Sequence, residues 1–390
     1  MDKDELRAWL RLSMTQGVGN DAARRLLACF GSPQSVFDQT EATLSQVVNP
    51  LQAQALCSVP NELAVQFVRT QQWLAQAPDA HHHALWTLGD AHYPHALLQL
   101  ADPPLMLYAA GQTQARLGNA IAIVGSRNPT PQGAQTAEQF AEALGAAGLC
   151  VVSGLALGVD GAAHLGALRS SKRSTTSGDV HWRTVAVVGT GLDRVYPRHH
   201  QALAGDVAQK GLLISEYHLG TPPLAGNFPK RNRIIAALGL GTLVVEAALK
   251  SGSLITAQMA LDLGKEVLAI PGSIHATQSH GCHALIRQGA KLVETAQDVM
   301  EELQLAPQQQ SDLFADALVA THHADTTQPS GATATHPLLN HMGYVPVSLD
   351  ALQARCGLDT ANLQAQLLTL ELDGEIGRLP GGLFQRLASA

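Results

Sequence analysis

The chain has 390 residues and a formal net charge of −7, and its 46% hydrophobic residues are enough for a sizeable core spread over two or three domains. No apolar run reaches the roughly 18 residues of a membrane span, and the start MDKDELRAWL is charged and amphipathic, so we expect no secretory signal peptide there. Five cysteines without CxxC spacing indicate reduced thiols. We therefore expect a cytoplasmic protein that makes no use of a membrane, a metal or another cofactor.

Charge is distributed unevenly along the chain. Residues 1–110 carry 6 Lys and Arg against 10 Asp and Glu, residues 111–293 carry 16 against 10, and residues 294–390 carry 3 against 12. The middle segment is therefore basic inside an acidic protein, and a local positive field matters more to a polyanion than the total charge does. This distribution predicts a nucleic-acid partner for the middle segment.

Residues 1–75 are predicted to form a small domain of short amphipathic helices. Within it, Gln16–Pro33 resembles a helix-hairpin-helix unit, in which Gly17 and Gly19 form a tight turn whose N–H groups hold a phosphate. A plain connection between helices with glycine caps fits the same residues. The next stretch, Pro78–Pro94, contains a His81–His83 triplet, which we interpret as solvated loop and not as a metal site.

From about residue 116 the pattern alternates between apolar strand-like runs and helical segments. The expected strands lie at 120–126, 149–154, 184–191, 211–216, 241–247, 265–272 and 290–293. This alternation predicts an α/β domain over 76–304, with a doubly wound, mostly parallel, Rossmann-like sheet covered by helices on both faces. A Gln- and Thr-rich linker over 305–335 and a winged-helix domain over 336–390 are expected to follow.

The loops after the strands have a common chemistry. In a doubly wound sheet, ligands bind beyond the carboxyl ends of the strands. The loops expected there are VGSR, VSGLALGVD, VGTGLD, SEYHLG, EAALKSGS and IPGS, and five of the six place Gly directly beside Ser or Thr. Glycine lets the backbone approach an anion closely, and hydroxyl groups cap the next helix or donate to phosphate. Repetition at nearly every strand end suits a ligand with several phosphates, although small residues are common in any one such loop.

Four windows around these loops contain no Asp or Glu. They contain the cations Arg116, Arg127, Arg169, Lys172, Arg173, Lys230, Arg231, Arg233, Arg287 and Lys291. Each phosphate that such a cation neutralises adds salt-dependent affinity. The basic, polar insert over 169–183 is expected to be a loop near the strand ends.

FPKRNR, residues 228–233, is the sharpest single feature because it opens a predicted helix with three cations. The helix macrodipole disfavours cations at that end, so the pattern indicates that an anion is expected there. Phe228 can stack on a base, which is the usual contact of proteins that bind single strands without sequence preference. An alternative is that Arg231 and Arg233 form ion pairs with Glu216 and Glu246.

The strings IVGSR, VSGLALGVDGAAH, VAVVGTGLDRVYP, LISE, FPKRNRIIA, VVEA, SGSLITA, IPGS and GCHALIRQGA run in this order over residues 120–290. In order and spacing they resemble the DNA-processing protein A (DprA/Smf) family. The resemblance implies a protein without catalytic activity that binds and protects incoming single-stranded DNA above the sheet and loads the RecA recombinase onto it during natural transformation. It also implies a homodimer formed through the Rossmann-like domain.

By motif position, the resemblance implies a set of DNA-binding residues made of cations, one aromatic ring and small residues that offer their backbone. They are Arg127, Ser153, Gly154, Gly189, Gly191, Arg198, Phe228, Lys230, Arg231, Arg233, Gly252 and Ser253. The chain departs from the family pattern at His200 and His283, where the family usually has Asn. Both histidines retain a donor, and they make mildly pH-dependent binding an expectation.

Two enzyme classes are alternatives. A dinucleotide enzyme needs GxGxxG after the first strand, and VGSRNPTPQG lacks it. A nucleotide-processing enzyme similar to the phosphoribohydrolases is closer, because residues 238–247 keep GTxxxE, although they lack the preceding PGG. Glu246, Glu216 and Asp160 would then be catalytic carboxylates. We favour structural roles for them, in capping helices and orienting arginines.

The winged helix raises a separate question, because such domains often place their third helix in the major groove of DNA. Here the third predicted helix, 359–376, has no Lys or Arg and contains Asp359, Glu371, Asp373 and Glu375. Phosphates would repel these side chains. We therefore expect a protein-contact or regulatory module at the C-terminus.

Overall fold

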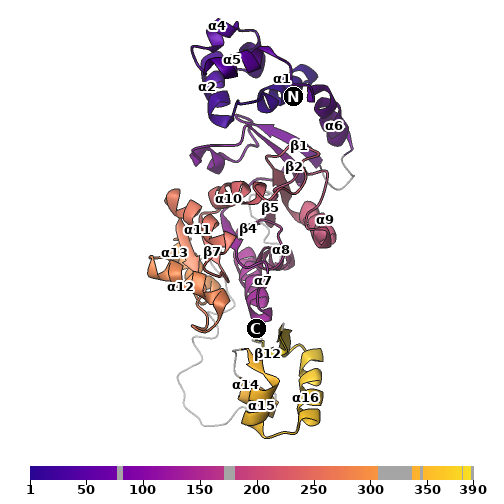
Figure 1. The fold of residues 1–390 in the computed structure, drawn as a ribbon, viewed down its shortest axis with the longest axis vertical. Coiled ribbons are helices and arrows are strands. Elements are labelled where there is room, and N and C mark those ends of the chain that lie inside the picture. The colour runs from indigo at the N-terminus through magenta and orange to yellow at the C-terminus, as the bar shows by residue number, and fades with distance from the viewer. Residues whose placement is uncertain (77–81, 171–180, 306–335, 343–345, 380, 388–390) are drawn as a thin grey trace, which may run out of the picture.

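A nine-stranded sheet runs through the middle of the molecule, between a helical N-terminal part and a small C-terminal unit (Figure 1). The computed structural model describes residues 1–76, 82–170, 181–305, 336–342, 346–379 and 381–387. His81, most of the predicted basic insert and nearly all of the predicted linker lie outside the described residues. Among the helices that are described, none combines the length and the apolar character that crossing a bilayer requires.

The strand order is β1-β2-β6-β5-β4-β3-β7-β8-β9. The strands are β1 (His82–Thr87), β2 (Met106–Gly111), β3 (Ala120–Val124), β4 (Cys150–Ser153), β5 (Thr184–Val187), β6 (Leu212–Ser215), β7 (Gly241–Val244), β8 (Glu266–Ala269) and β9 (Lys291–Leu292). From β6 to β9 every neighbouring pair is parallel, whereas β2 pairs antiparallel with both β1 and β6. The predicted doubly wound, mostly parallel sheet is therefore confirmed.

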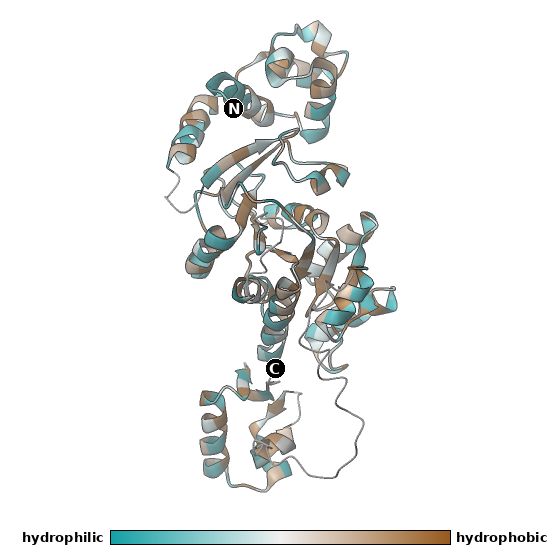
Figure 2. Cartoon of the chain, turned by 180° about the vertical axis from the view of Figure 1, so that it is seen from behind, coloured by the Kyte–Doolittle hydropathy of each residue, from teal (hydrophilic) through white to brown (hydrophobic). Residues whose placement is uncertain are grey.

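Helices cover both faces of this sheet because the strands are apolar on both sides. In β3, Ile121 and Ile123 pack against one helical layer, while Ala120, Ala122 and Val124 pack against the other. The first layer contains α7 (Pro131–Ala146), α8 (Val159–Arg169), α9 (Gln201–Lys210) and α13 (Ala296–Glu302). The second contains α10 (Asn227–Leu238), α11 (Gly252–Asp262) and α12 (His280–Arg287). Figure 2 shows the result, with brown strands between helices that carry teal on their outer sides.

The N-terminal helices pack against the antiparallel edge of the sheet. They are α1 (Lys3–Met14), α2 (Asn20–Phe30), α3 (Pro33–Phe37), α4 (Glu41–Leu44), α5 (Pro50–Cys57) and α6 (Leu63–Ala75). Their core includes Leu85 of β1 and Tyr108 of β2. Gly17 has a φ of +78° in the turn between α1 and α2, a conformation that glycine adopts without strain.

The interpretation of the histidine triplet as solvated loop is wrong for His82 and His83, because they begin β1. His83 stacks on Trp73 with ring centroids 3.9 Å apart, and its Nδ1 lies 2.6 Å from the carbonyl oxygen of Trp73. The imidazole is thus part of the contact between α6 and the sheet. The His-rich sequence does not show the alternation of apolar and polar residues that indicates a strand. β1 is stabilised instead by antiparallel pairing with β2, which lies further along the chain.

The C-terminal unit is a winged helix, as predicted. It consists of α14 (Pro337–Met342), α15 (Leu349–Cys356) and α16 (Thr360–Leu372), with β10 (Val347–Ser348), β11 (Ile376–Leu379) and β12 (Leu383–Arg386) in the order β10-β12-β11. Asp359 caps α16 by accepting a hydrogen bond from the Asn362 N–H at 3.0 Å. The strands β11 and β12 form the wing.

Candidate nucleic-acid interface

A cavity of about 440 Å³ lies at the carboxyl ends of β3, β4 and β7, and we call it the groove cavity. The residues that line it include Arg127, Asp160, Phe228, Arg231, Lys250 and Ser253. The strand order reverses at β3, since β4 to β6 lie on one side of it and β7 to β9 on the other. This reversal leaves a crevice at which doubly wound proteins bind their ligands.

Three cations line the groove cavity at different depths. Arg127, which follows β3, and Lys250, which follows β7, are exposed. Arg231 of α10 is only 3% exposed, and its Nη1 donates to the carbonyl oxygen of Val187 at 2.7 Å. The lining of the cavity therefore contains two exposed cations and one buried cation that is held by a hydrogen bond.

Burial removes the Arg231 guanidinium from water, which costs free energy. Burial lowers its pKa to about 10, with Asp160 opposing the shift, so the guanidinium remains charged at neutral pH. Asp160 accepts from the Ala156 N–H at 3.3 Å, and burial raises the pKa of this carboxyl against the influence of Arg231. A side chain at Gly154 would collide with the Arg231 guanidinium and lie 2.6 Å from Asp160 Oδ2, so glycine is required there.

The start of α11 forms another wall of the groove cavity. Ser251 caps the helix, since its Oγ accepts from the Ser253 N–H at 3.3 Å and lies 2.6 Å from the Ser253 hydroxyl. Gly252 is exposed, and a Cβ built on it would meet nothing within 4 Å. A helix start with open approach, next to Lys250, is favourable for a phosphate.

Phe228 contacts both a cation and a second aromatic ring. The guanidinium carbon of Arg127 lies 5.6 Å from the Phe228 ring centroid, and the Tyr196 centroid is also 5.6 Å away, with the rings tilted by 38°. Gly189 makes room for the ring, because a Cβ there would lie 3.2 Å from Phe228 Cδ1. Half-buried Phe228 and exposed Tyr196 together offer an aromatic surface beside the cations.

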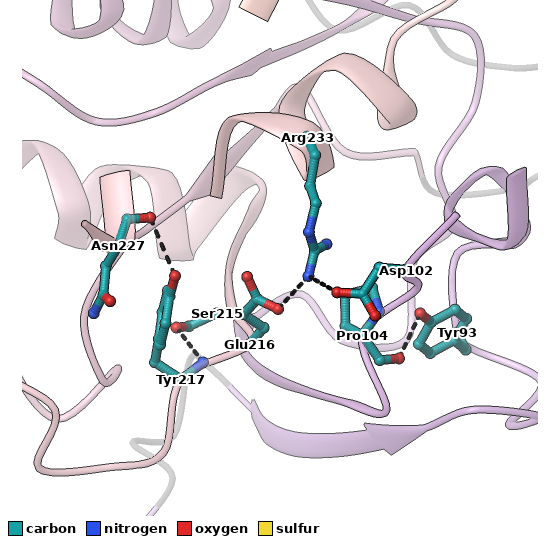
Figure 3. A network of polar contacts seen from close by, with 8 residues as sticks. All are labelled: Tyr93, Asp102, Pro104, Ser215, Glu216, Tyr217, Asn227 and Arg233. Carbon is teal, nitrogen blue, oxygen red and sulfur yellow. Dashed lines mark hydrogen bonds and ion pairs between the residues drawn. The ribbon is translucent and has the colours of Figure 1, made fainter. Parts of the chain in front are cut away.

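Arg233 does not join this group. Its Nη2 lies 2.5 Å from Glu216 Oε2 and 3.8 Å from Asp102 Oδ2 (Figure 3). The side chains of Arg233 and Glu216 are only 12% and 6% exposed. The alternative ion pair with Glu216 is thus present for Arg233, whereas Arg231 donates to a carbonyl and has Asp160 as its carboxylate neighbour.

Four of the other predicted residues do not line the groove cavity. Arg198 is exposed on the short helix η2 (Arg198–His200), and Lys230 is exposed on α10. Ser153 is buried, with its hydroxyl donating to the carbonyl oxygen of Ile123 at 2.7 Å. Gly191 is buried, and a Cβ on it would lie 2.5 Å from Asp193 Oδ1.

The three carboxylates of the enzyme alternative do not converge. Glu246 accepts from the N–H and the hydroxyl of Thr130, at 2.9 and 2.6 Å, and Thr130 caps α7. Glu216 pairs with Arg233, and only Asp160 lines the groove cavity. Burial raises the pKa of all three carboxyl groups. No three His, Cys, Asp or Glu side chains among the described residues are placed to hold a metal ion.

Both histidines at the departures from the family pattern contact the backbone. His200 Nδ1 lies 3.0 Å from the carbonyl oxygen of Leu155, and His283 Nε2 lies 3.0 Å from that of Gly272. Each imidazole ring therefore contacts the backbone of a loop that follows a strand. Neither histidine lines the groove cavity.

The sequence analysis did not identify two residues of the interface, Lys250 and Tyr196. Lys250 directly precedes the capped start of α11, in the loop after β7, and a cation at that position was the available signal. Tyr196 follows β5 by nine residues, and nothing in the local pattern places it beside Phe228.

The fold and the site together define a Rossmann-like α/β protein with a cation-lined crevice at the topological switch point and a C-terminal winged helix. The family model described as DNA recombination-mediator protein A matches residues 84–304, and the one described as DprA winged helix domain matches residues 322–382. The chain therefore belongs to the DprA/Smf family of DNA-processing proteins.

Individual relatives agree with this assignment. Protein Smf of Escherichia coli K12 is 37% identical over 98% of this chain and 96% of its own length. The DNA processing protein DprA of Streptococcus pneumoniae is 43% identical over 54% of this chain and 71% of its own length. The X-ray structure of DprA from Streptococcus pneumoniae superposes with a TM-score of 0.61 and 32% identity, over 77% of this chain and 98% of that one.

Proposed function

We propose that this protein binds single-stranded DNA along the groove cavity and acts as a recombination mediator, which protects incoming DNA and loads the RecA recombinase onto it during natural transformation. The observation that carries the proposal is the meeting of Arg127, Arg231, Lys250 and the Phe228 ring around one cavity at the switch point of the sheet. Cations hold a DNA backbone without reading its sequence, and aromatic rings stack on unpaired bases. Family membership supports the same function.

The mechanism is binding without bond-making. The exposed cations Arg127 and Lys250 neutralise phosphates, the start of α11 offers N–H groups to a phosphate, and Arg231 supplies a fixed positive charge in the wall. Bases rest on the aromatic surface and remain partly exposed, so that the strand can be handed over to the recombinase. Glu216 and Glu246 serve the fold, by fixing Arg233 and the cap of α7 respectively.

The proposal extends to assembly and location. A homodimer through the Rossmann-like domain would bring two groove cavities onto one strand and raise avidity without any new contact type. The protein would act in the cytoplasm, where incoming strands meet the recombinase. The acidic winged helix would serve protein contacts or regulation, since α16 offers phosphates no cation.

A salt titration of DNA binding tests the proposal. Fluorescence anisotropy with a labelled oligothymidylate, and with a duplex of equal length, should show tighter binding of the single strand. Arg127→Ala and Lys250→Ala should each weaken binding and lower the slope of log K against log salt by about 0.7, the value for one single-strand phosphate contact. Lys210→Ala is the matched control, because Lys210 is exposed at the end of α9, next to the amino end of β6. Unchanged affinity and slope in both groove variants would refute the proposed groove.

A further inference from the structure

A second, smaller cavity of about 200 Å³ lies beside α9, and we call it the α9 cavity. Tyr196 lines the α9 cavity and Phe228 lines the groove cavity. Their ring centroids are 5.6 Å apart, and Leu155 of the α9 cavity directly precedes Ala156 of the groove cavity, so the two cavities are neighbours. The contacting rings of Tyr196 and Phe228 offer a strand held in the groove cavity a path to the second one.

The lining of the α9 cavity is aliphatic inside and polar at a few positions. Leu155, Val188, Leu192, Val195, Ala204 and Leu213 supply the apolar surface. Arg194 and Gln201 supply the polar groups. Such a combination suits the flat, apolar faces and polar edges of a nucleobase, whereas a phosphate would be poorly solvated there.

Arg194 is held in place at this cavity. Its Nη2 lies 3.1 Å from Asp193 Oδ2, and the other oxygen of Asp193 accepts from the Gly220 N–H at 2.8 Å. The side chain of Arg194 is 39% exposed. A guanidinium plane fixed in this way can stack on a base or donate to its edge, as in many proteins that bind single strands.

We propose that the α9 cavity is a second nucleotide subsite, which takes one base of the strand whose backbone lies in the groove cavity. Tyr196 and Phe228 then act as a two-ring ridge that supports neighbouring bases on the path between the cavities. The inference rests on the proposed function, because it needs a strand in the groove. It adds Tyr196, Arg194 and Gln201 to the residues that bind DNA.

Gly205 allows the subsite to be blocked without disturbing the fold. It lines the α9 cavity from α9, it is exposed, and a Cβ built on it meets nothing within 4 Å. Leucine is also a better helix former than glycine. Gly205→Leu should therefore fill the cavity in a stably folded protein. Ala202→Leu is the matched control, because Ala202 is exposed on the same helix but does not line the cavity.

The experiment measures the binding of a short oligothymidylate by anisotropy, with an abasic residue placed at each position in turn. In the wild-type protein, removal of the base that enters the α9 cavity should weaken binding about five- to a hundredfold, as expected for one stacked base. Gly205→Leu should weaken binding of the intact strand by a similar factor and abolish the penalty at that position alone. Tyr196→Ala should reduce the same penalty, and Tyr196→Phe should retain it. Free thymidine should not displace the labelled strand from the protein, because the base enters the α9 cavity only as part of DNA.

The outcomes separate this inference from the proposed function. If Arg127→Ala loses affinity while Gly205→Leu and Ala202→Leu both bind the intact strand like the wild type, the groove stands and the subsite is refuted. Normal strand binding combined with loss of recombinase loading in Gly205→Leu would assign the cavity to a protein partner and also refute it. A wild-type protein without preference for single strands would overturn both proposals.

Discussion

Replacing Arg233 by alanine should lower the free energy of unfolding of the protein. It should not change the number of cations that contact DNA. Arg233 and Glu216 form a pair whose side chains are only 12% and 6% exposed, with Nη2 and Oε2 2.5 Å apart. Removing one partner of such a buried pair leaves an uncompensated charge, which typically costs about 3–5 kcal/mol of unfolding free energy. Asp102 adds little, because it is 3.8 Å away and 44% exposed, a setting worth at most about 1 kcal/mol.

The loss of unfolding free energy caused by Arg233→Ala should increase with pH. Burial raises the pKa of Glu216, while Arg233 and Lys230 oppose this shift and Asp102 adds to it. Without Arg233 the folded-state pKa rises further, so the folded protein holds a proton that the unfolded chain releases more readily. Stability then falls as pH rises above the unfolded-state pKa. The destabilisation by Arg233→Ala should therefore be larger at pH 8 than at pH 5.

Urea unfolding followed by circular dichroism at both pH values measures this effect. Lys230→Ala, which removes an exposed cation from the same helix, is the control and should change stability by less than about 0.5 kcal/mol. The double variant Arg233→Met/Glu216→Leu should recover most of the loss, because apolar replacement of a buried pair is often neutral. A loss below about 1 kcal/mol, or a fall in the salt slope of DNA binding by about 0.7, would refute the structural role of Arg233.

Three further predictions concern pH, the winged helix and catalysis. Burial lowers the pKa of His164 to about 3, so the folded protein resists a proton that the unfolded chain takes up below about pH 6.5. Stability should fall by about 2 kcal/mol between pH 7 and pH 5, and His164→Asn should remove this dependence in urea unfolding. Deleting residues 336–390 should leave affinity for single strands within about twofold by anisotropy, since α16 offers phosphates no cation; a tenfold loss would contradict this. When the protein is incubated with nucleoside monophosphates, chromatography should detect no free base. If free base is detected and Glu246→Gln abolishes its release, the protein is an enzyme.

The sequence predicted the sheet well because its signal is local. Each strand from β3 to β8 is a short, mostly apolar run that is followed by a helix before the next strand. The antiparallel strands β1 and β2 lack it. β1 begins with two histidines, one of which packs on Trp73 of α6, so only the tertiary contact explains its place in the sheet.

The candidate site was predicted in part, and the reason lies in helix geometry. Lys230, Arg231 and Arg233 were grouped because they are close in sequence at the start of one helix. Residues i and i+2 are about 200° apart around a helix, so Arg231 and Arg233 cannot face one ligand. Arg231 accordingly lines the groove cavity, while Arg233 reaches Glu216 on another side of α10. Tyr196 could not be found from sequence, because its contact with Phe228 joins the loop after β5 to the start of α10, 32 residues further along the chain.

The central claim is that a single strand lies in the crevice at the carboxyl ends of β3, β4 and β7. Photocrosslinking of an oligonucleotide that contains 5-iododeoxyuridine, followed by mass spectrometry of the adducts, tests it most directly. The account predicts adducts at Phe228 and Tyr196, suppressed by an excess of unlabelled single strand and reduced in Arg127→Ala. Adducts confined to α16 or to the N-terminal helices would contradict it.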